Sequence, residues 1–430
     1  MRETKENEIA DIFFLFFFSV VAITSNGQIA TFDISNYTYP DVDRRTFFIS
    51  PALNFSDQYQ ENNSRSSFDF DCNIQGSYIK NSRKFQQSKI FRTNVSYASN
   101  EGDNQASEKY FDIEMFGYMS NRYFINPKRF FELEFTGEAI YERQNIESFA
   151  INDYLSTRTL ISPKFGWGRI ENVTDAWHAI RILEELKKSG HLTRDLDSLE
   201  INLLANEISK LKNYRSRDLR LERIYEFKEL AKFLVLNKIC DESDYGFYAI
   251  LKDAYDFEGF QNRSSGSTFT IGLFNNYRTY NTNIHDSGYQ ILHDYGIAFE
   301  YEKFNPLSKD WQLSESYTVG IQRNNNKFSD FGGFNRQWQG SLSGNVRVGY
   351  FMNARTYFSL GPRVTYSKYF DPDIRSIRFL LYGYGYYYFS PRLRFDISGS
   401  FNFSQFGIEF QNPTNRNSIF IRAGFDYFLF

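Results

Sequence analysis

The side chains best suited to chemistry in this sequence are charged groups at every second position of long alternating segments. In 393–404, for example, Leu393 and Phe395 alternate with Arg394 and Asp396. Successive side chains of a β-strand point to opposite faces, so this pattern predicts a strand with one apolar and one polar face. The same period recurs along most of the chain in runs of about ten residues or more, the length that crosses a bilayer at a tilt.

The charges on the predicted polar faces change sign along the chain. Carboxylates dominate the strands before residue 140, and arginines dominate those after residue 340. If the strands close into a ring, an acidic wall faces a basic wall, and such a field orients and selects polar solutes in a water-filled pore. The predicted interior charges are Asp69, Asp71, Asp112, Glu114, Glu132, Glu134, Glu138, Arg347, Arg363, Arg378, Arg394 and Arg422.

A second interpretation of these charges stays open. The two walls can instead pair with one another and fill the interior of a closed, structural barrel. Barrels of about eight strands are filled by side chains, and a wider ring favours a pore, although loops or the N-terminal segment can plug it.

A tyrosine ladder can likewise stack sugars, but an aromatic girdle or interior packing fits it better. The ladder consists of Tyr382, Tyr384, Tyr386 and Tyr388.

Patterns typical of catalysis or metal binding are weak. The chain has four histidines, and only His285 with Asp286 joins a histidine to a carboxylate in a predicted outer loop, where a hydrolytic barrel needs them. Such a pair in a loop is usually only solvated. No G-x-S-x-G, H-E-x-x-H or phosphate-binding loop occurs. We therefore predict no enzymatic activity, no metal site and no cofactor.

The composition supports this interpretation. Aromatic residues make up 19% of the 430 residues, while charged residues make up 23%. A membrane barrel combines these features because it hides its apolar side chains by alternation. The net charge of −3 gives no basic excess, so nucleic acid is not an expected partner. The two cysteines, Cys72 and Cys240, suggest neither a disulfide framework nor a metal site.

The N-terminus carries an apolar run at 12–24. It is too short for a spanning helix and fits the apolar core of a secretory signal. Small residues follow, so we predict a signal peptide at 1–27 with cleavage before Gln28, and a periplasmic segment at 28–44. The acidic residues ahead of the run depart from the usual signal pattern, which leaves an uncleaved anchor or a wrongly assigned start codon as alternatives.

Fourteen alternating segments are recognisable, six within 45–168 and eight within 259–430. The connectors between them alternate between short and long, as do the periplasmic turns and outer loops of outer-membrane barrels. An even number of crossings returns both termini to one side. The predicted fold class is therefore an all-β transmembrane antiparallel barrel of about 14 strands, within about 12 to 16.

Between the two groups of strands, the apolar period changes to three and four. Ala176, Ile180 and Leu183 fall on one helical face, so an α-helical module is predicted at 169–258. Six crossings from a periplasmic N-terminus place this insert in the periplasm. Its charged face at 218–232 suits a periplasmic protein partner, although charge runs on helices are usually only solvated.

The last segment, 419–430, combines a polar residue, a glycine two positions on, alternating apolar residues and a terminal phenylalanine. It resembles the C-terminal insertion signal of bacterial outer-membrane β-barrel proteins. Arg422 and Gly424 match that signal, Tyr427 and Leu429 continue the alternation, and Phe430 lies one residue past it.

The resemblance implies recognition by the barrel assembly machinery and location in the outer membrane, surrounded by its lipid. The many Asn, Tyr and Phe residues resemble outer-membrane proteins of Bacteroidota-like bacteria, and no narrower family is recognised. The predicted function is a channel or transport component for polar solutes. The alternative is a closed structural or docking barrel that anchors the helical module for a partner.

Overall fold

A computed structural model describes residues 32–427 of the chain, apart from short stretches within that range. The predicted signal peptide, His285, Asp286, Leu429 and Phe430 lie outside the described residues. The stretches left out are 61–62, 103–104, 147–151, 214–218, 242–244, 257–261, 283–287, 329–333, 354, 372, 391–392 and 409–413.

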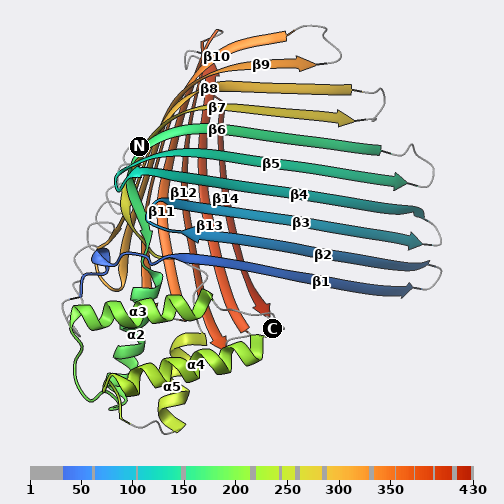
Figure 1. Ribbon diagram of the computed structural model, residues 1–430. Helices are drawn as coiled ribbons and strands as arrows, with labels where there is room; N and C mark the ends of the chain where they lie inside the picture. Colours follow the sequence, from blue (N-terminus) through green and yellow to red (C-terminus); the bar gives the residue numbers. More distant parts are fainter. Residues whose placement is uncertain are drawn as a thin grey trace, which may run out of the picture.

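Fourteen strands form a single antiparallel sheet in which each strand pairs with its neighbours in sequence (Figure 1). The predicted strand number and antiparallel order are thereby confirmed. Before the helices come β1 (Val42–Gln60), β2 (Asn63–Asn81), β3 (Phe85–Gly102), β4 (Gln105–Asn126), β5 (Arg129–Ile146) and β6 (Asn152–Asn172). After them come β7 (Ser264–Thr282), β8 (Gly288–Pro306), β9 (Trp311–Phe328), β10 (Phe334–Asn353), β11 (Thr356–Phe370), β12 (Asp373–Ser390), β13 (Leu393–Ile408) and β14 (Thr414–Tyr427).

The strands are longer than a membrane crossing requires. They run from 14 residues in β14 to 22 in β4, whereas about 9 to 11 tilted residues suffice. The sequence-based boundaries were too short because apolar alternation marks only part of each strand, while backbone pairing continues into polar extensions.

Pairing sorts the side chains onto two faces. Phe299 is opposite Val319, and Val319 is opposite Leu342, so these three share one face of the sheet. All three are exposed. We call this the outer face. The opposite face, which carries Glu134 and is contacted by the helices, is the inner face.

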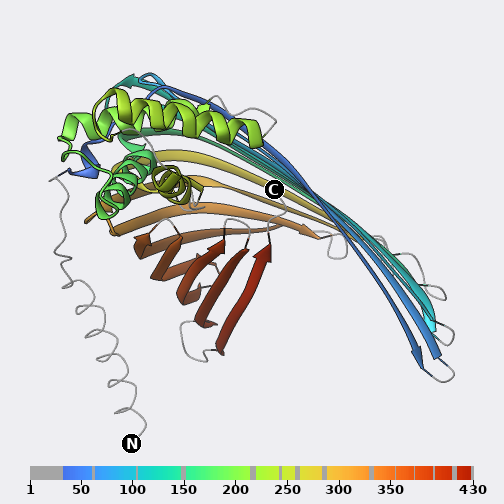
Figure 2. The same cartoon turned by 90° about the horizontal axis from the view of Figure 1, so that it is seen from below.

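The sheet is strongly curved but not closed (Figure 2). β1 and β14 are its two edges, and no pairing joins them among the described residues. The closed ring that the alternation predicts is therefore not formed in this structure. Closure needs a ladder between the first and last strands, and among the described residues β14, the shortest strand with 14 residues, pairs only with β13.

The two ends of the sheet differ. The connectors after β2, β4, β8, β10 and β12, the N-terminal segment and the helices between β6 and β7 share one end, here called the turn end. The connectors after β1, β3, β5, β7, β9, β11 and β13 share the other, the loop end. The inserted helical module therefore belongs to the turn end.

The insert comprises α2 (Thr174–Lys188), α3 (Ser198–Asn213), α4 (Leu219–Leu236) and α5 (Tyr245–Asp256), which confirms the predicted helical module. A capping box starts α3: Glu200 N donates to Asp197 Oδ1 at 2.8 Å, and Asp197 N donates to Glu200 Oε2 at 3.1 Å. No described helix has the length and hydropathy that a membrane crossing demands.

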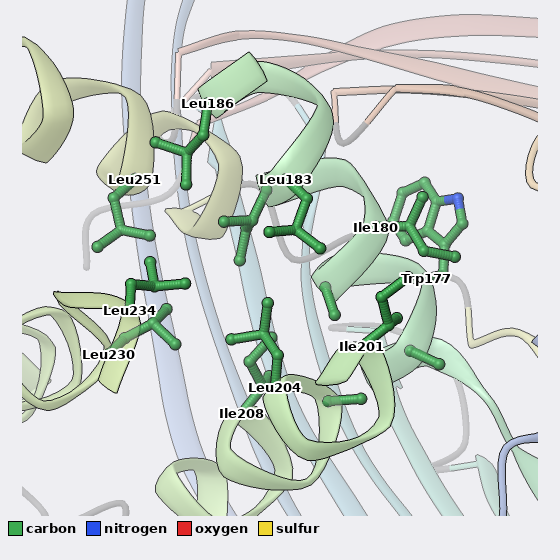
Figure 3. Packing of buried hydrophobic residues seen from close by; sticks show 14 of the residues in the cluster. Trp177, Ile180, Leu183, Leu186, Ile201, Leu204, Ile208, Leu230, Leu234 and Leu251 are labelled. Carbon is green, nitrogen blue, oxygen red and sulfur yellow. The ribbon is translucent and has the colours of Figure 1, made fainter. Parts of the chain in front are cut away.

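The core of the insert is an apolar cluster shared by all four helices (Figure 3). Burial of such side chains is the main source of stability for a small helical unit. The same cluster continues into the N-terminal segment, with its short 3-10 helix η1 (Ile34–Asn36), and into the sheet. Its helical members include Leu183, Leu186, Leu204, Ile208, Leu230, Leu234 and Leu251.

Candidate functional site

The pairing register places all twelve predicted interior charges on the inner face. Asp71 lies opposite Ser96, which lies opposite Asp112, and residues opposite one another share a face. The carboxylates lie on β2, β4 and β5, and the arginines lie on β10 to β14. The two sets are thus separated by several strands.

Carboxylates of β5 are paired with cations on their own side of the sheet. Glu132 Oε2 lies 3.0 Å from Arg122 Nε, and Glu134 Oε2 lies 2.6 Å from Lys164 Nζ. Lys164 Nζ also lies 2.8 Å from Glu300 Oε2 on β8. Sequence reasoning missed these partners, although the even-numbered, polar-face positions of Arg122 and Lys164 were visible in the alternation. Lys164 is shared by two carboxylates, so these pairs neutralise only part of the negative charge on this part of the inner face.

The carboxylates nearer the loop end differ. Asp69, Asp71, Asp112 and Glu114 have no ion pair among the described residues, and Glu114 accepts only a 3.2 Å hydrogen bond from Asn94 Nδ2. The inner face of β2 to β4 therefore keeps a net negative charge.

The inner face of β10 to β14 is net positive. Arg394 Nε lies 2.7 Å from Asp396 Oδ2, and Arg378 Nε donates to Asn402 Oδ1 at 3.2 Å. Within the part of the chain that the structure describes, Arg347, Arg363 and Arg422 have no carboxylate at ion-pair distance. The transverse charge separation across a closed pore stays a prediction.

At the turn end, the inner face carries an aromatic cluster. The ring centroids of Phe351 and Tyr357 lie 4.8 Å apart, those of Tyr357 and Tyr386 lie 5.7 Å apart, and those of Tyr386 and Tyr388 lie 5.5 Å apart. Tyr386 and Tyr388 are buried. This half of the tyrosine ladder therefore packs inside the protein and has no ring face open for sugar stacking.

Helix α2 enters this cluster. The indole of Trp177 lies 5.7 Å from the Phe351 ring, centroid to centroid, and Trp177 Nε1 donates to Lys309 O at 2.9 Å. Trp177 is buried, and Figure 3 shows it beside Ile180 on the same helix. The insert thus packs against the inner face and covers part of its turn end.

Two buried arginines fix the insert to the turns. Arg181 of α2 pairs with Glu184 at 3.0 Å and with Asp310, and its Nη2 donates to Phe351 O at 2.7 Å. Arg263, between α5 and β7, is fully buried. It donates to the carbonyl oxygens of Ser308 at 2.9 Å, of Lys309 at 2.5 Å and of Trp311 at 3.1 Å. Charge-assisted bonds of this kind are stronger than neutral ones.

The other side of the insert reaches the first strands through the N-terminal segment. Asn81 Nδ2 at the end of β2 donates to Tyr39 O at 3.1 Å. Burial raises the pKa of Tyr39 to about 12, with the Arg44 charge acting in the opposite direction. A cavity of about 1110 Å³ lies between this segment, the turns after β2 and β4, and Asn206 of α3. The insert therefore bridges the turn end from the β1 side to β10.

The remaining predicted residues lie on β14, on the outer face of the sheet or in the insert. Arg422 lies on the inner face and Gly424 follows on the same strand, β14, which ends at Tyr427. His293 lies on the outer face, opposite Tyr277. His178 and His191 belong to the insert. The His285–Asp286 hypothesis lies outside the described residues.

Solved structures of similar architecture are outer-membrane barrels. The alcaligin outer-membrane receptor FauA of Bordetella pertussis matches at 7% identity and a TM-score of 0.34, over 91% of this chain and 59% of the receptor, so this chain spans less than two thirds of it. The monoaromatic hydrocarbon channel CymD matches at 11% identity and a TM-score of 0.27, over 92% of this chain and 90% of the channel. The translocator domain of the autotransporter NalP from Neisseria meningitidis matches at 9% identity and a TM-score of 0.22, over 99% of this chain and 98% of the domain.

No protein-family model and no curated protein sequence matches the chain. At such identities and TM-scores, the solved structures give no information on what this chain binds or moves. The structural neighbours are outer-membrane β-barrels of several kinds, and no narrower family stands out among them.

Proposed function

We propose that this chain is an outer-membrane β-barrel that acts as a channel or transport component for polar solutes, with its helical insert on the periplasmic side. The observation that carries this proposal is the two-faced sheet. Soluble proteins rarely expose apolar patches larger than a few hundred Å², yet exposed apolar side chains follow the outer face from β1 to β14. They include Phe47, Phe91, Met115, Phe135, Ile161, Leu273, Val319, Leu342, Leu360, Ile397 and Ile421.

In a lipid environment, the strands must also form a closed ring in which every strand is paired on both sides. An unpaired strand edge leaves N–H and C=O groups without partners in hydrocarbon, at a cost of several kcal/mol each. In the proposed membrane form, β1 and β14 therefore pair with each other. Fourteen strands then enclose an interior wider than side chains alone fill.

The two ends of the sheet support the proposed orientation. Bacterial outer-membrane barrels keep their short turns and both termini in the periplasm. The described chain enters β1 and leaves β14 at the turn end, where the insert also lies. In the proposed orientation, the insert contacts the periplasmic mouth of the pore.

We assign the selection of solutes to the charged side chains on the inner face. Negative charge on β2 to β4 and positive charge on β10 to β14 give a field across the enclosed water. Paired groups such as Glu132 and Arg122 contribute little to that field, because each neutralises the other. The arginines without carboxylate partners, Arg347 and Arg363, contribute most.

A second candidate function is favoured by the contact of Trp177 with the aromatic cluster. If the insert and the tyrosines fill the turn end, the barrel is closed and serves to anchor the insert for a periplasmic protein partner. The two functions differ in whether solutes cross the membrane through the barrel.

Liposome swelling tests the proposal. Vesicles that contain the refolded mature protein should swell in isotonic solutions of small sugars and amino acids, with rates that fall as solute size increases. Protein whose circular dichroism shows a folded, strand-rich barrel but whose vesicles never swell would contradict transport and favour the docking function.

A further inference from the structure

Two arginines are close neighbours on the inner face of β10 and β11. Arg363 is opposite Asn345, and the same register continues on the far side of the next two positions, so Arg347 faces Gly361. Arg347 and Arg363 are therefore diagonal neighbours, about 7 to 8 Å apart. Two like charges at this distance repel each other, and an anion that lies between them relieves the repulsion.

A tyrosine ring passes between the two arginines. Tyr382 of β12 is opposite Gly361, and its hydroxyl donates to Asn345 Oδ1 on β10 at 3.0 Å. The phenol therefore crosses β11, with Arg347 on one side of its path and Arg363 on the other. A Cβ atom at Gly361 would lie 2.3 Å from the backbone oxygen of the facing strand, so this close approach requires glycine.

Most side chains around the arginine pair are neutral hydroxyl groups. Leu380, which is opposite Arg363, is an apolar exception. Hydroxyls both donate and accept hydrogen bonds, so they match the hydroxyl groups of a polyol. The inner-face neighbours on β9 to β13 include Ser314, Ser316, Ser343, Thr365 and Ser400.

Inner-face carboxylates on the nearby strands are held by other cations or lie farther away. Glu300 of β8 accepts a hydrogen bond from Lys164 Nζ at 2.8 Å. Asp396 of β13 pairs with Arg394 at 2.7 Å. Glu302 lies on β8, two strands from β10. Within the described sheet, no carboxylate therefore reaches the arginine pair at ion-pair distance.

The arginine pair lies on the loop side of the covered turn end. Phe351, which Trp177 of the insert contacts, follows Arg347 by four residues on β10, about 14 Å along the strand. Tyr386 is buried, whereas Tyr382 is only half-buried. The tyrosine ladder thus changes from packing beside the insert to a partly accessible ring beside the arginines.

We propose that Arg347, Arg363 and Tyr382 bind a small hydroxylated organic anion. This inference rests on the proposed function, because it names the class of solute that the inner face selects. Guanidinium groups bind carboxylate and phosphate oxygens through paired, charge-assisted hydrogen bonds. The phenol ring offers an apolar surface to the carbon skeleton of the solute. The common chemistry is an oxyanion, carboxylate or phosphate, carried on a polyol.

Isothermal titration calorimetry with the full mature protein, refolded in detergent, tests this site. Gluconate and glucose 6-phosphate should bind, and neutral glucose should bind about tenfold more weakly or worse. The Arg347→Ala, Arg363→Ala double variant should lose gluconate affinity by about tenfold or more. Equal binding of glucose and gluconate, or undiminished gluconate binding by the double variant, would overturn the inference.

A second inner-face arginine pair provides the matched control. Arg158 of β6 is opposite Arg278 of β7, and Arg158 lies 4.0 Å from Glu138. The Arg158→Ala, Arg278→Ala double variant removes the same number of charges and should bind gluconate like the wild type. An equal loss of affinity in both double variants would show a general effect of charge and refute the assigned site.

The contribution of the ring is tested separately. Tyr382→Leu should weaken glucose 6-phosphate binding severalfold and leave inorganic phosphate binding unchanged. In the wild type, glucose 6-phosphate should bind more tightly than inorganic phosphate, and equal affinities would refute the hydroxylated class of ligand. This comparison of ligands on the wild type remains decisive even where a variant does not fold.

Binding in detergent needs no passage through a membrane, so this experiment and liposome swelling fail independently. Swelling without gluconate binding would refute only the anion site. Gluconate binding without swelling would support the site and contradict transport.

Discussion

Trp177 of α2 packs against Phe351 at the end of β10, with their ring centroids 5.7 Å apart. Trp177 lies in the insert and Phe351 lies in the second group of strands, and their contact joins the inserted helices to the inner face of the sheet. The turn end of the sheet and the insert are therefore one packed unit.

Replacing Trp177 by alanine should loosen the insert. Truncation of a buried aromatic side chain costs about 3 to 5 kcal/mol, and here it removes the contact of α2 with the aromatic cluster. Hydrogen exchange in α2 should become faster in the variant. Leu199→Ala is the control, because Leu199 is exposed on α3. Unchanged exchange in α2 would show that Trp177 does not hold the insert in place.

Lys212→Met should destabilise the insert by about 3 kcal/mol or more, because it leaves the buried carboxylate of Asp175 without its cation. Lys212 Nζ lies 2.6 Å from Asp175 Oδ1, and both side chains are 4% exposed. Lys210 on the same helix pairs with Glu207 at the surface, so Lys210→Met should cost less than about 0.5 kcal/mol. Urea denaturation followed by tryptophan fluorescence measures both, and equal losses would contradict the buried pair.

The first turn of α3 should become less stable in acid. Hydrogen bonds from Arg194 and from the Asp197 backbone lower the pKa of Glu200 to about 2, below the unfolded value of about 4.3. A lowered pKa stabilises the fold above pH of about 4.3, and this stabilisation is lost as the pH falls toward 2.

The effect of Glu200 is modest because the group is largely solvated. Helicity measured by circular dichroism should depend less on pH in Glu200→Gln than in the wild type across this window. Glu185→Gln, at an exposed pair with Lys188, is the control. Identical acid profiles for wild type and Glu200→Gln would exclude this contribution.

Charge reversal on the inner face should alter ion selectivity. Arg363 lies on the inner face of β11, opposite Asn345, so Arg363→Glu should shift the reversal potential in a salt gradient toward cations. Arg143→Glu changes charge equally but on the outer face, and it should leave the reversal potential unchanged. Equal shifts in both variants would indicate a surface effect and not a charged pore.

Much of the sheet was predictable because its signal is local. Alternation alone assigns Glu134 and Arg363 to the polar face, since side-chain direction follows from the two-residue period. The change to helical periodicity was equally visible around Ile180. The strand ends were not, because backbone pairing continues beyond the apolar positions that mark a strand.

The site contacts were not predictable from one sequence. Lys164 and Glu300 are 136 residues apart in the chain, and Arg181 and Phe351 are 170 apart. No local pattern encodes such pairs, because they exist only once the strands and the insert are arranged in space. The aromatic ladder and the helix were each visible in the sequence, but the packing of the helix against the ladder was not.

The most direct test of a covered pore is planar-bilayer conductance with and without the insert. Asn172 and Ser264 are opposite partners in the ladder, so an Asn-Gly turn can join β6 to β7 in place of 173–263. The intact protein should show discrete conductance steps, and the deletion should show larger ones because the periplasmic mouth is uncovered. Silence from both proteins, each first shown to be folded and strand-rich, would contradict the channel.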